Sequence, residues 1–248
     1  MCGRYASSRK PEDLIEEFEI TDSRVGVPLE PDYNVAPTKE VYAVMERPPS
    51  QDRSAPAERQ LRTLRWGLVP SWAKDPSIGN RMINARMETV AEKPSYRRAF
   101  SSRRCLLPAD GYFEWYPTTE TTKAGKPVKQ PFFIHPVDGG VLAMAGLYEI
   151  WKDPTREEDD PDLFRWTCTV ITTDAEDSLG HIHDRMPLMV TPERWADWLD
   201  PTISGKDRLL SLLVPAAPGL LEAFPVSTAV NNVRNNGPEL VAALPITD

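Results

Sequence analysis

Proline constrains the fold of this chain more than any other residue type. The sequence has 25 prolines and 13 glycines among 248 residues. Each proline fixes its own φ angle and lacks the amide hydrogen that helices and central strands use. The count therefore predicts many irregular connections and few long helices.

Short strand-like segments dominate the remaining pattern. The clearest is 166–173 (WTCTVITT), which is rich in β-branched residues. We expect further extended segments or strands at 33–38, 41–45, 61–68, 104–107, 111–116, 131–135, 141–151 and 225–230. Short helices are expected at 11–18, 88–91, 95–101, 192–199, 205–213 and 239–243, and polar loops at 47–59, 118–130 and 152–162. Strands that outnumber helices and follow one another closely predict a mostly antiparallel α+β domain.

Composition narrows the class of protein. Charged residues make up 27% and hydrophobic residues 40% of the chain, which is typical of globular proteins. No apolar run is long enough to span a bilayer, and the first residues lack the apolar stretch of a signal peptide. The chain has three cysteines, Cys2, Cys105 and Cys168. A small, odd number argues against a disulfide framework and is typical of proteins in a reducing cytoplasm.

The net charge of -8 argues against non-specific adhesion to nucleic acid over the whole surface. Segment 80–104 nevertheless carries seven cations, opposed only by Glu88 and Glu92. Acidic residues gather elsewhere, notably at 153–162. The segment is either a basic face for nucleic acid or a solvated, charge-rich helix, and composition alone favours the helix.

Cys2 has a chemistry that depends on its position. Removal of Met1 would give a residue with a free α-amine and a thiol on adjacent carbons. Such an aminothiol can condense with an aldehyde to a Schiff base, which the thiolate then closes to a thiazolidine. The α-amine titrates near ~7.7–8.0, far below lysine, so it is available at neutral pH. The alternative is that residue 2 is a cysteine by chance, in a frayed terminus. The position of the residue alone favours this alternative, because chain termini are usually disordered.

Glu114 lies among aromatic residues in 111–115 (GYFEW). A carboxylate in an apolar setting has a raised pKa and suits general acid–base catalysis. The alternative is a strand on which Glu114 faces solvent, and the sequence leaves both open.

His181 and His183 form an H-x-H pattern, which on a strand would put both side chains on one face, as in a metal site. Because the cysteines show no C-x-x-C spacing, we expect no zinc site and no cofactor. His183 precedes Arg185 and suits proton transfer near a phosphate. The alternative is a surface histidine in a turn that ends at Pro187.

Asn84 could hold a nucleophile or substrate by hydrogen bonds while Arg86 binds a phosphate. Its alternative role is as the cap of a following helix. Trp66 and Trp72 could stack on bases, although tryptophans are more often core residues and we expect Trp66 to be buried.

Taken together, these residues resemble the SRAP (SOS-response-associated peptidase) family of abasic site processing proteins. The matching segments extend over nearly the whole chain, and their order is highly specific. They are MCGRY (1–5), YNVAP (33–37), RWGLVPSW (65–72), INAR (83–86), PADGYFEW (108–115), QPF (130–132), AGLYE (145–149), IHDRMP (182–187) and VNNVRN (230–235).

The resemblance implies one SRAP-like domain over residues 1–248, approximately 2–245, with a barrel-like antiparallel core and short flanking helices. It implies a thiazolidine cross-link between Cys2 and abasic sites in single-stranded DNA. The family's catalytic asparagine, glutamate and histidine correspond to Asn84, Glu114 and His183. DNA contacts correspond to the side chains of Arg4, Arg86, Arg185, Trp72 and Thr172. We expect a monomer without a membrane partner.

One position departs from the family pattern. Several members carry a second bulky aromatic residue just after the position of Trp72, where this chain has Ala73. We therefore expect the wedging of bases that flank the lesion to be weaker here, or to come from another residue.

The resemblance also suggests a reaction sequence. Arginines hold the kinked strand, His183 or Glu114 helps open the sugar, the Cys2 amine forms the Schiff base, and the thiolate closes the ring. A ring that failed to close would allow β-elimination, which is lyase activity. Two alternatives stay open: an N-terminal-nucleophile cysteine peptidase or amidohydrolase that uses the same thiol and removes Met1 itself, and a non-catalytic binder of modified DNA.

Overall fold

The computed structural model describes residues 2–49, 52, 54–121, 123–125, 127–175 and 177–245. Its strands are β1 (Tyr5–Ser7), β2 (Asp22–Ser23), β3 (Asp32–Val35), β4 (Glu40–Arg47), β5 (Glu58–Trp66), β6 (Asn84–Arg86), β7 (Arg104–Ala109), β8 (Gly111–Thr121), β9 (Pro127–Pro136), β10 (Leu142–Lys152), β11 (Phe164–Asp174), β12 (Arg185–Pro187) and β13 (Leu221–Pro225). Its helices are α1 (Pro11–Glu17), α2 (Arg97–Ser102), α3 (Asp177–Gly180), α4 (Trp195–Leu199) and α5 (Lys206–Leu210), with 3-10 turns η1 (Pro76–Arg81), η2 (Met87–Thr89), η3 (Pro192–Arg194), η4 (Thr228–Asn231) and η5 (Pro238–Val241).

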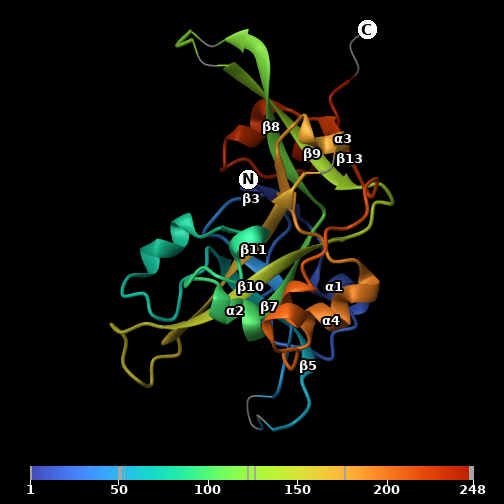
Figure 1. Ribbon diagram of the computed structural model, residues 1–248. Helices are drawn as coiled ribbons and strands as arrows, with labels where there is room; N and C mark the ends of the chain where they lie inside the picture. Colours follow the sequence, from blue (N-terminus) through green and yellow to red (C-terminus); the bar gives the residue numbers. More distant parts are fainter. Residues whose placement is uncertain are drawn as a thin grey trace.

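A closed five-stranded barrel forms the centre of the molecule (Figure 1). Its strands follow the order β5, β4, β7, β10 and β11, and β11 returns to pair with β5. Four of these pairings are antiparallel, and β5–β11 is parallel. An odd number of strands cannot alternate direction around a closed ring, so one parallel pair is required. The expectation of a barrel-like α+β fold is confirmed, and the barrel is mixed.

A second, antiparallel sheet lies against the barrel in the order β13, β9, β8, β1 and β3. Within it, β8 and β9 form a hairpin that projects from the body (Figure 1). The first strand, β1, lies between β8 and β3, so the start of the chain is paired on both sides. This placement brings the N-terminal residues into the interior of the fold.

Alternate residues of the barrel strands divide between two apolar clusters, as the two-residue period of a strand requires. On β4, Tyr42 and Val44 pack with the residues of α1, α2 and α4. Their neighbours Val41 and Ala43 pack instead with residues of the second sheet and with Trp66. Trp66 is fully buried, as expected from the sequence.

The helices are short, as the proline content predicts. Among the described helices the longest is α1, with seven residues. Pro11 occupies its first turn, where a missing amide hydrogen costs nothing. Its apolar residues Leu14 and Phe18 are one turn apart and are both buried. In the described residues no helix is long and apolar enough to cross a membrane.

Several predicted boundaries were wrong. The strand expected at 225–230 ends at Pro225, and Ser227 begins η4 by accepting a hydrogen bond from the Ala229 amide at 3.2 Å. The hairpin loop expected at 118–130 is mostly strand, since β8 reaches Thr121 and β9 begins at Pro127. The helices expected at 88–91 and 239–243 are single 3-10 turns, and the one at 205–213 is only α5.

Candidate active site

The backbone around Cys2 is held by strand pairing. β1 begins three residues later, and its Tyr5 pairs with Tyr112 of β8. The Phe113 amide donates a hydrogen bond to the Arg4 carbonyl oxygen at 2.9 Å. Cys2 itself is fully buried. The alternative of a frayed terminus is therefore wrong for this residue.

Burial governs the acidity of the Cys2 thiol. It raises the pKa of the thiol well above its usual range, and the nearby Glu114 carboxylate adds to the effect. In this state the sulfur is a neutral thiol, and it needs a base beside it to become a nucleophile.

Asn84 lies on β6, which runs parallel to β11 with Asn84 opposite Val170. Its Nδ2 donates a hydrogen bond to the Cys2 carbonyl oxygen at 2.7 Å. Its Oδ1 is buried and has no hydrogen-bond partner among the described residues. The Tyr96 hydroxyl donates to the Asn84 carbonyl oxygen at 3.0 Å and so supports the strand from its other side. The alternative role as a helix cap is wrong, because Asn84 is a strand residue and η2 has no side-chain cap.

Glu114 lies on β8 and is 3% exposed. The alternative in which it faces solvent is therefore wrong. Burial raises the pKa of its carboxyl group, and the nearby His183 partly offsets the rise. A carboxyl group whose pKa is raised toward neutrality can both donate and accept a proton.

His183 lies between α3 and β12. Its Nδ1 accepts a hydrogen bond from the Arg185 amide at 3.0 Å, which in the neutral ring leaves the proton on Nε2. The Asp184 carboxylate lies 3.0 Å from the same nitrogen. Since the charge of His183 acts on Glu114, the two side chains are neighbours.

The H-x-H pattern lies in a turn and not on a strand, so its two residues do not share a strand face. The His181 ring lies beside Tyr116, with centroids 6.4 Å apart. Within the described part of the chain, no three His, Cys, Asp or Glu side chains cluster as metal ligands would.

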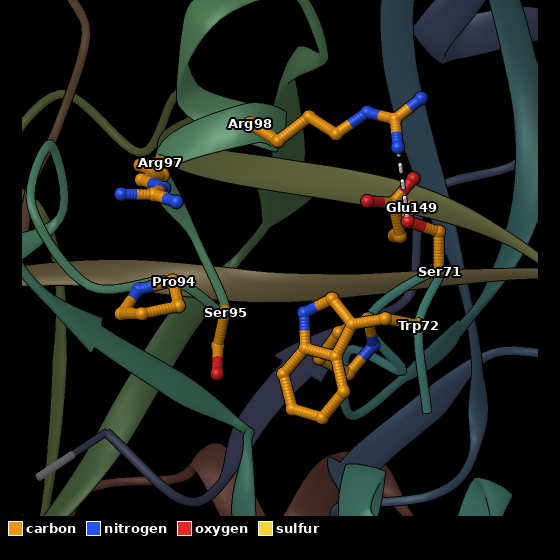
Figure 2. A pocket seen from close by; sticks show the side chains of 8 residues that line it. Ser71, Trp72, Pro94, Ser95, Arg97, Arg98 and Glu149 are labelled. Atoms are coloured by element: carbon orange, nitrogen blue, oxygen red, sulfur yellow. Dashed lines mark hydrogen bonds between the residues drawn. The ribbon is translucent and has the colours of Figure 1, made fainter. Parts of the chain in front are cut away.

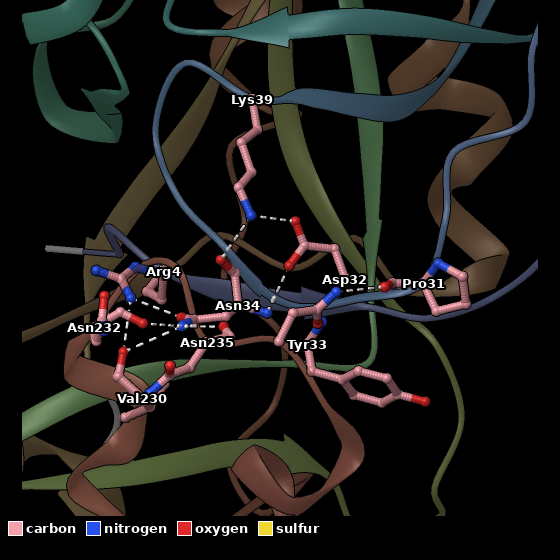
Figure 3. A network of polar contacts seen from close by, with 10 residues as sticks. Arg4, Pro31, Asp32, Tyr33, Asn34, Lys39, Val230, Asn232 and Asn235 are labelled. Atoms are coloured by element: carbon pink, nitrogen blue, oxygen red, sulfur yellow. Dashed lines mark hydrogen bonds and ion pairs between the residues drawn. The ribbon is translucent and has the colours of Figure 1, made fainter.

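Arg4 is anchored next to Cys2 by a polar network that sequence reasoning missed (Figure 3). Its Nη1 donates to Asn34 Oδ1 at 2.6 Å and to the Val230 carbonyl oxygen at 2.9 Å. Asn34 is fully buried, and its Nδ2 donates to the carbonyl oxygens of Val230, Asn232 and Asn235. The segments 33–37 and 230–235 thus meet at Asn34. Their polar residues were the only sequence signal of this contact.

The other predicted DNA contacts differ in exposure. Arg86 is exposed and forms no ion pair within the described residues. Arg185 is only 10% exposed, and its Nη1 lies 2.7 Å from Glu88 Oε1 and 2.6 Å from Asp174 Oδ1. Its Nη2 donates to the Thr172 carbonyl oxygen at 2.7 Å. The Thr172 side chain is buried beside it. Arg86 is thus open to solvent, whereas the Arg185 guanidinium is occupied by two carboxylates.

Trp72 is 59% exposed at the end of the RWGLVPSW loop. The turn at Gly67 has φ +123°, and a Cβ there would lie 2.6 Å from the Gly79 carbonyl oxygen, so only glycine fits. Figure 2 shows Trp72 lining a pocket of about 450 Å³ with Arg97 and Arg98.

Ala73, where several family members carry an aromatic residue, turns away from this pocket. It packs in a small buried cluster with Val69 and Trp151. The Trp151 indole also donates to the Ala73 carbonyl oxygen at 2.7 Å. This close packing accounts for the small side chain, and Trp72 is the exposed tryptophan of the loop.

Comparison with known proteins gives a consistent result. The model of the SOS response associated peptidase (SRAP) family matches residues 1–233. The chain is 41% identical to abasic site processing protein YoqW of Bacillus subtilis, covering 97% of this chain and 99% of the relative. It is 34% identical to abasic site processing protein YedK of Escherichia coli, again over 97% and 99%.

The fold agrees as well. A crystal structure of a Bacteroides thetaiotaomicron protein superposes with a TM-score of 0.80 at 25% identity, covering 98% of this chain and all of the other. The family match, the relatives and the shared fold all extend over nearly the full length. This chain belongs to the SOS response associated peptidase (SRAP) family.

Proposed function

We propose that the chain, once Met1 is removed, forms a thiazolidine cross-link between Cys2 and the ring-opened aldehyde of an abasic site in single-stranded DNA. The observation that carries the proposal is the setting of Cys2. Its backbone is held by β1 and by Asn84, and its thiol lies within electrostatic reach of the Glu114 carboxyl. The names of the relatives, which are abasic site processing proteins, point to the same substrate.

The first step joins the Cys2 α-amine to the aldehyde carbon and releases one water. Protonation of the carbinol oxygen speeds this loss. Glu114 suits the role because burial raises the pKa of its carboxyl group, which favours the protonated form. His183, with a proton on Nε2 in the neutral ring, is the second candidate acid and can assist opening of the sugar.

The second step closes the ring. The Cys2 sulfur adds to the imine carbon, its proton moves through Glu114 to the nitrogen, and no further atom is lost. Burial favours this intramolecular step because water is excluded from the imine. If closure failed, the imine would permit β-elimination and cleavage of the strand.

DNA binding in this proposal uses the exposed cations and aromatic residue around the site. Arg86 and Trp72 are accessible, and Arg97 and Arg98 belong to the same face as Trp72. Phosphates on these arginines make binding sensitive to salt even though the chain is acidic overall.

The test is incubation with single-stranded DNA that carries one abasic site, followed by a denaturing gel. Wild-type protein should give a stable adduct, and Cys2→Ala and Cys2→Ser should each give only a labile one, because both variants keep the α-amine and lack the thiol. Cys168→Ala, which removes another buried thiol, is the matched control and should cross-link normally. A stable adduct with Cys2→Ala would refute the mechanism. Turnover of an amide substrate without DNA would favour a cysteine hydrolase instead.

A further inference from the structure

A second cleft, of about 620 Å³, lies toward the opposite end of the barrel. It is formed where β4 and β10 end and β11 begins, and its walls include Arg47, Arg62, Arg103, Phe164 and Trp166. Val170, which lies opposite the Cys2-bonded Asn84, follows Trp166 by four residues on β11, roughly 13 Å at the rise of a strand. The cleft is therefore separate from the surroundings of Cys2.

Two guanidinium groups in this cleft are held by an aromatic ring and not by carboxylates. The Cζ atoms of Arg47 and Arg62 lie 4.8 Å and 4.4 Å from the centroid of the Trp166 ring. Neither arginine forms an ion pair with a carboxylate in the described parts of the chain. By contrast, Arg103 lies 2.6 Å from Glu149.

The charge of Arg62 is only partly compensated, by Asp22 and by a 2.9 Å hydrogen bond from its Nε to Gln60 Oε1. The pKa of Arg62 is lowered first by burial and then by the charge of Arg47. Two like charges on one ring are stabilised when a phosphate lies between or above them, because each can then donate charge-assisted hydrogen bonds. Phosphate oxygens therefore suit this pair.

An apolar platform lies beside the two cations. Phe164 is 52% exposed and, two residues before Trp166, points to the same face of β11. The Tyr148 ring stacks on the Trp166 ring, with the two centroids 5.9 Å apart and an interplanar angle of 15°. An exposed aromatic side chain next to paired guanidiniums has the form of a base-stacking site.

The cleft also adjoins the Trp72 pocket. Glu149 lines the Trp72 pocket, Arg103 lines this cleft, and the two side chains are bonded to each other. A strand that passes Trp72 would meet the cleft next.

We propose that this cleft binds a nucleotide, with the phosphate on Arg47 and Arg62 and the base on Phe164. A single strand that continues past Trp72 and a free nucleoside monophosphate offer the same chemistry. The site goes beyond the proposed function, because it requires neither Cys2 nor an abasic site.

The test uses intact protein and DNA without a lesion. Affinity for a fluorescent oligothymidylate long enough to extend past Trp72 is measured by anisotropy, and affinity for dTMP and for inorganic phosphate by calorimetry. The variants are Arg47→Gln, Arg62→Gln and Phe164→Ala. Phe164→Ala removes an exposed side chain and should leave the fold unchanged. Arg208→Gln, at an exposed arginine on α5, is the charge-matched control.

If a strand occupies the cleft, each variant should weaken binding of the long oligonucleotide about fivefold or more, and each arginine variant should reduce the salt slope by roughly one. If a free nucleotide occupies it, the same variants should weaken binding of dTMP. Arg208→Gln should change neither affinity.

Unchanged affinity of all three variants for both probes would overturn the proposal. Phosphate bound as tightly as dTMP, with no effect of Phe164→Ala, would overturn it as well. Cross-linking of the variants to an abasic site at saturating DNA is a separate measurement. A loss of cross-linking would bear on the proposed role of Cys2 and would not test nucleotide binding in the cleft.

Discussion

Asn84 donates a 2.7 Å hydrogen bond from Nδ2 to the main-chain carbonyl oxygen of Cys2. The residues are 82 positions apart in the chain, and the bond ties the segment before β1 to β6. It fixes the direction in which the Cys2 amine and thiol face. The same amide leaves its Oδ1 buried and without a hydrogen-bond partner among the described residues, so a substrate hydroxyl could bind there.

Asn84→Asp should slow cross-linking more than Asn84→Ala. Alanine removes one hydrogen bond of about 1 kcal/mol, equal to a rate loss of roughly fivefold. Aspartate keeps the shape but faces the Cys2 carbonyl oxygen with a second acceptor. Single-turnover rates on abasic single-stranded DNA measure both, with the exposed Asn80→Ala as control. Equal rates for Asn84→Asp and wild type would show that this bond does not orient Cys2.

Glu114 should destabilise the fold as the pH rises. Because burial raises the pKa of its carboxyl group above 4.5, the native state holds this proton more tightly than the unfolded state. The favourable contribution is complete below pH 4.5 and is lost as the pH passes the raised pKa. Glu114→Gln should therefore gain free energy of unfolding relative to wild type as the pH rises.

Urea unfolding of both proteins at a series of pH values above 4.5 measures this difference. The exposed Glu157→Gln, which makes the same change of charge, is the control. A difference between Glu114→Gln and wild type that shrinks with rising pH would contradict the assignment.

We expect Glu88 to compete with DNA for Arg185. Glu88 Oε1 lies 2.7 Å from Arg185 Nη1, and this hydrogen bond lowers the pKa of the Glu88 carboxyl group. Glu88→Gln should remove one of the two carboxylates that hold the guanidinium, Asp174 being the other. It should therefore tighten binding of single-stranded DNA about two- to fivefold, with a steeper dependence on salt. Anisotropy titrations measure this against Glu157→Gln. If both variants gained the same affinity for single-stranded DNA, the cause would be the change in net charge and not the release of Arg185.

Trp72 should contribute to DNA affinity and not to stability, because it is 59% exposed. Trp72→Ala should weaken binding of single-stranded DNA by about 1 kcal/mol or more, the usual contribution of one stacked base. Trp72→Phe should retain most of the affinity, and the thermal midpoint should stay the same in both variants. An unchanged affinity in Trp72→Ala would remove this side chain from the DNA path.

Arg104 is a structural cation. It is 2% exposed and donates hydrogen bonds to the carbonyl oxygens of Trp198, Phe100, Ser101 and Asp200, which lie near the ends of α2 and α4. Arg104→Met should lower the free energy of unfolding by about 3 kcal/mol, because buried carbonyl groups lose their donors. Urea unfolding checks this, with Arg208→Met as control. A loss below that of the control would refute the role.

Local pattern predicted much of this fold. The β-branched run at 166–173 predicted β11, and the proline content predicted the short helices. The β5–β11 parallel pair that closes the barrel has no local signal, because it follows from counting strands around a ring. The strand expected at 225–230 was wrong for a local reason. The strand ends at Pro225, and Ser227 begins a 3-10 turn.

For the site, too, local sequence predicted some features and not others. The aromatic neighbours of Glu114 left a buried and a solvent-facing carboxylate both open, and the structure shows that it is buried. The sequence could not predict that Cys2 is held in place, because this depends on pairing of β1 with β8, more than a hundred residues later in the chain. The contact between Arg4 and Val230 spans 226 positions, and no local pattern could predict it.

Intact mass spectrometry of the protein after incubation with abasic single-stranded DNA tests the central claim most directly. We predict a chain that lacks Met1 and carries the oligonucleotide with the loss of one water, with peptide mapping that places the adduct on Cys2. A stable adduct on a lysine, on a chain that retains Met1, or on Cys2→Ala would contradict the account.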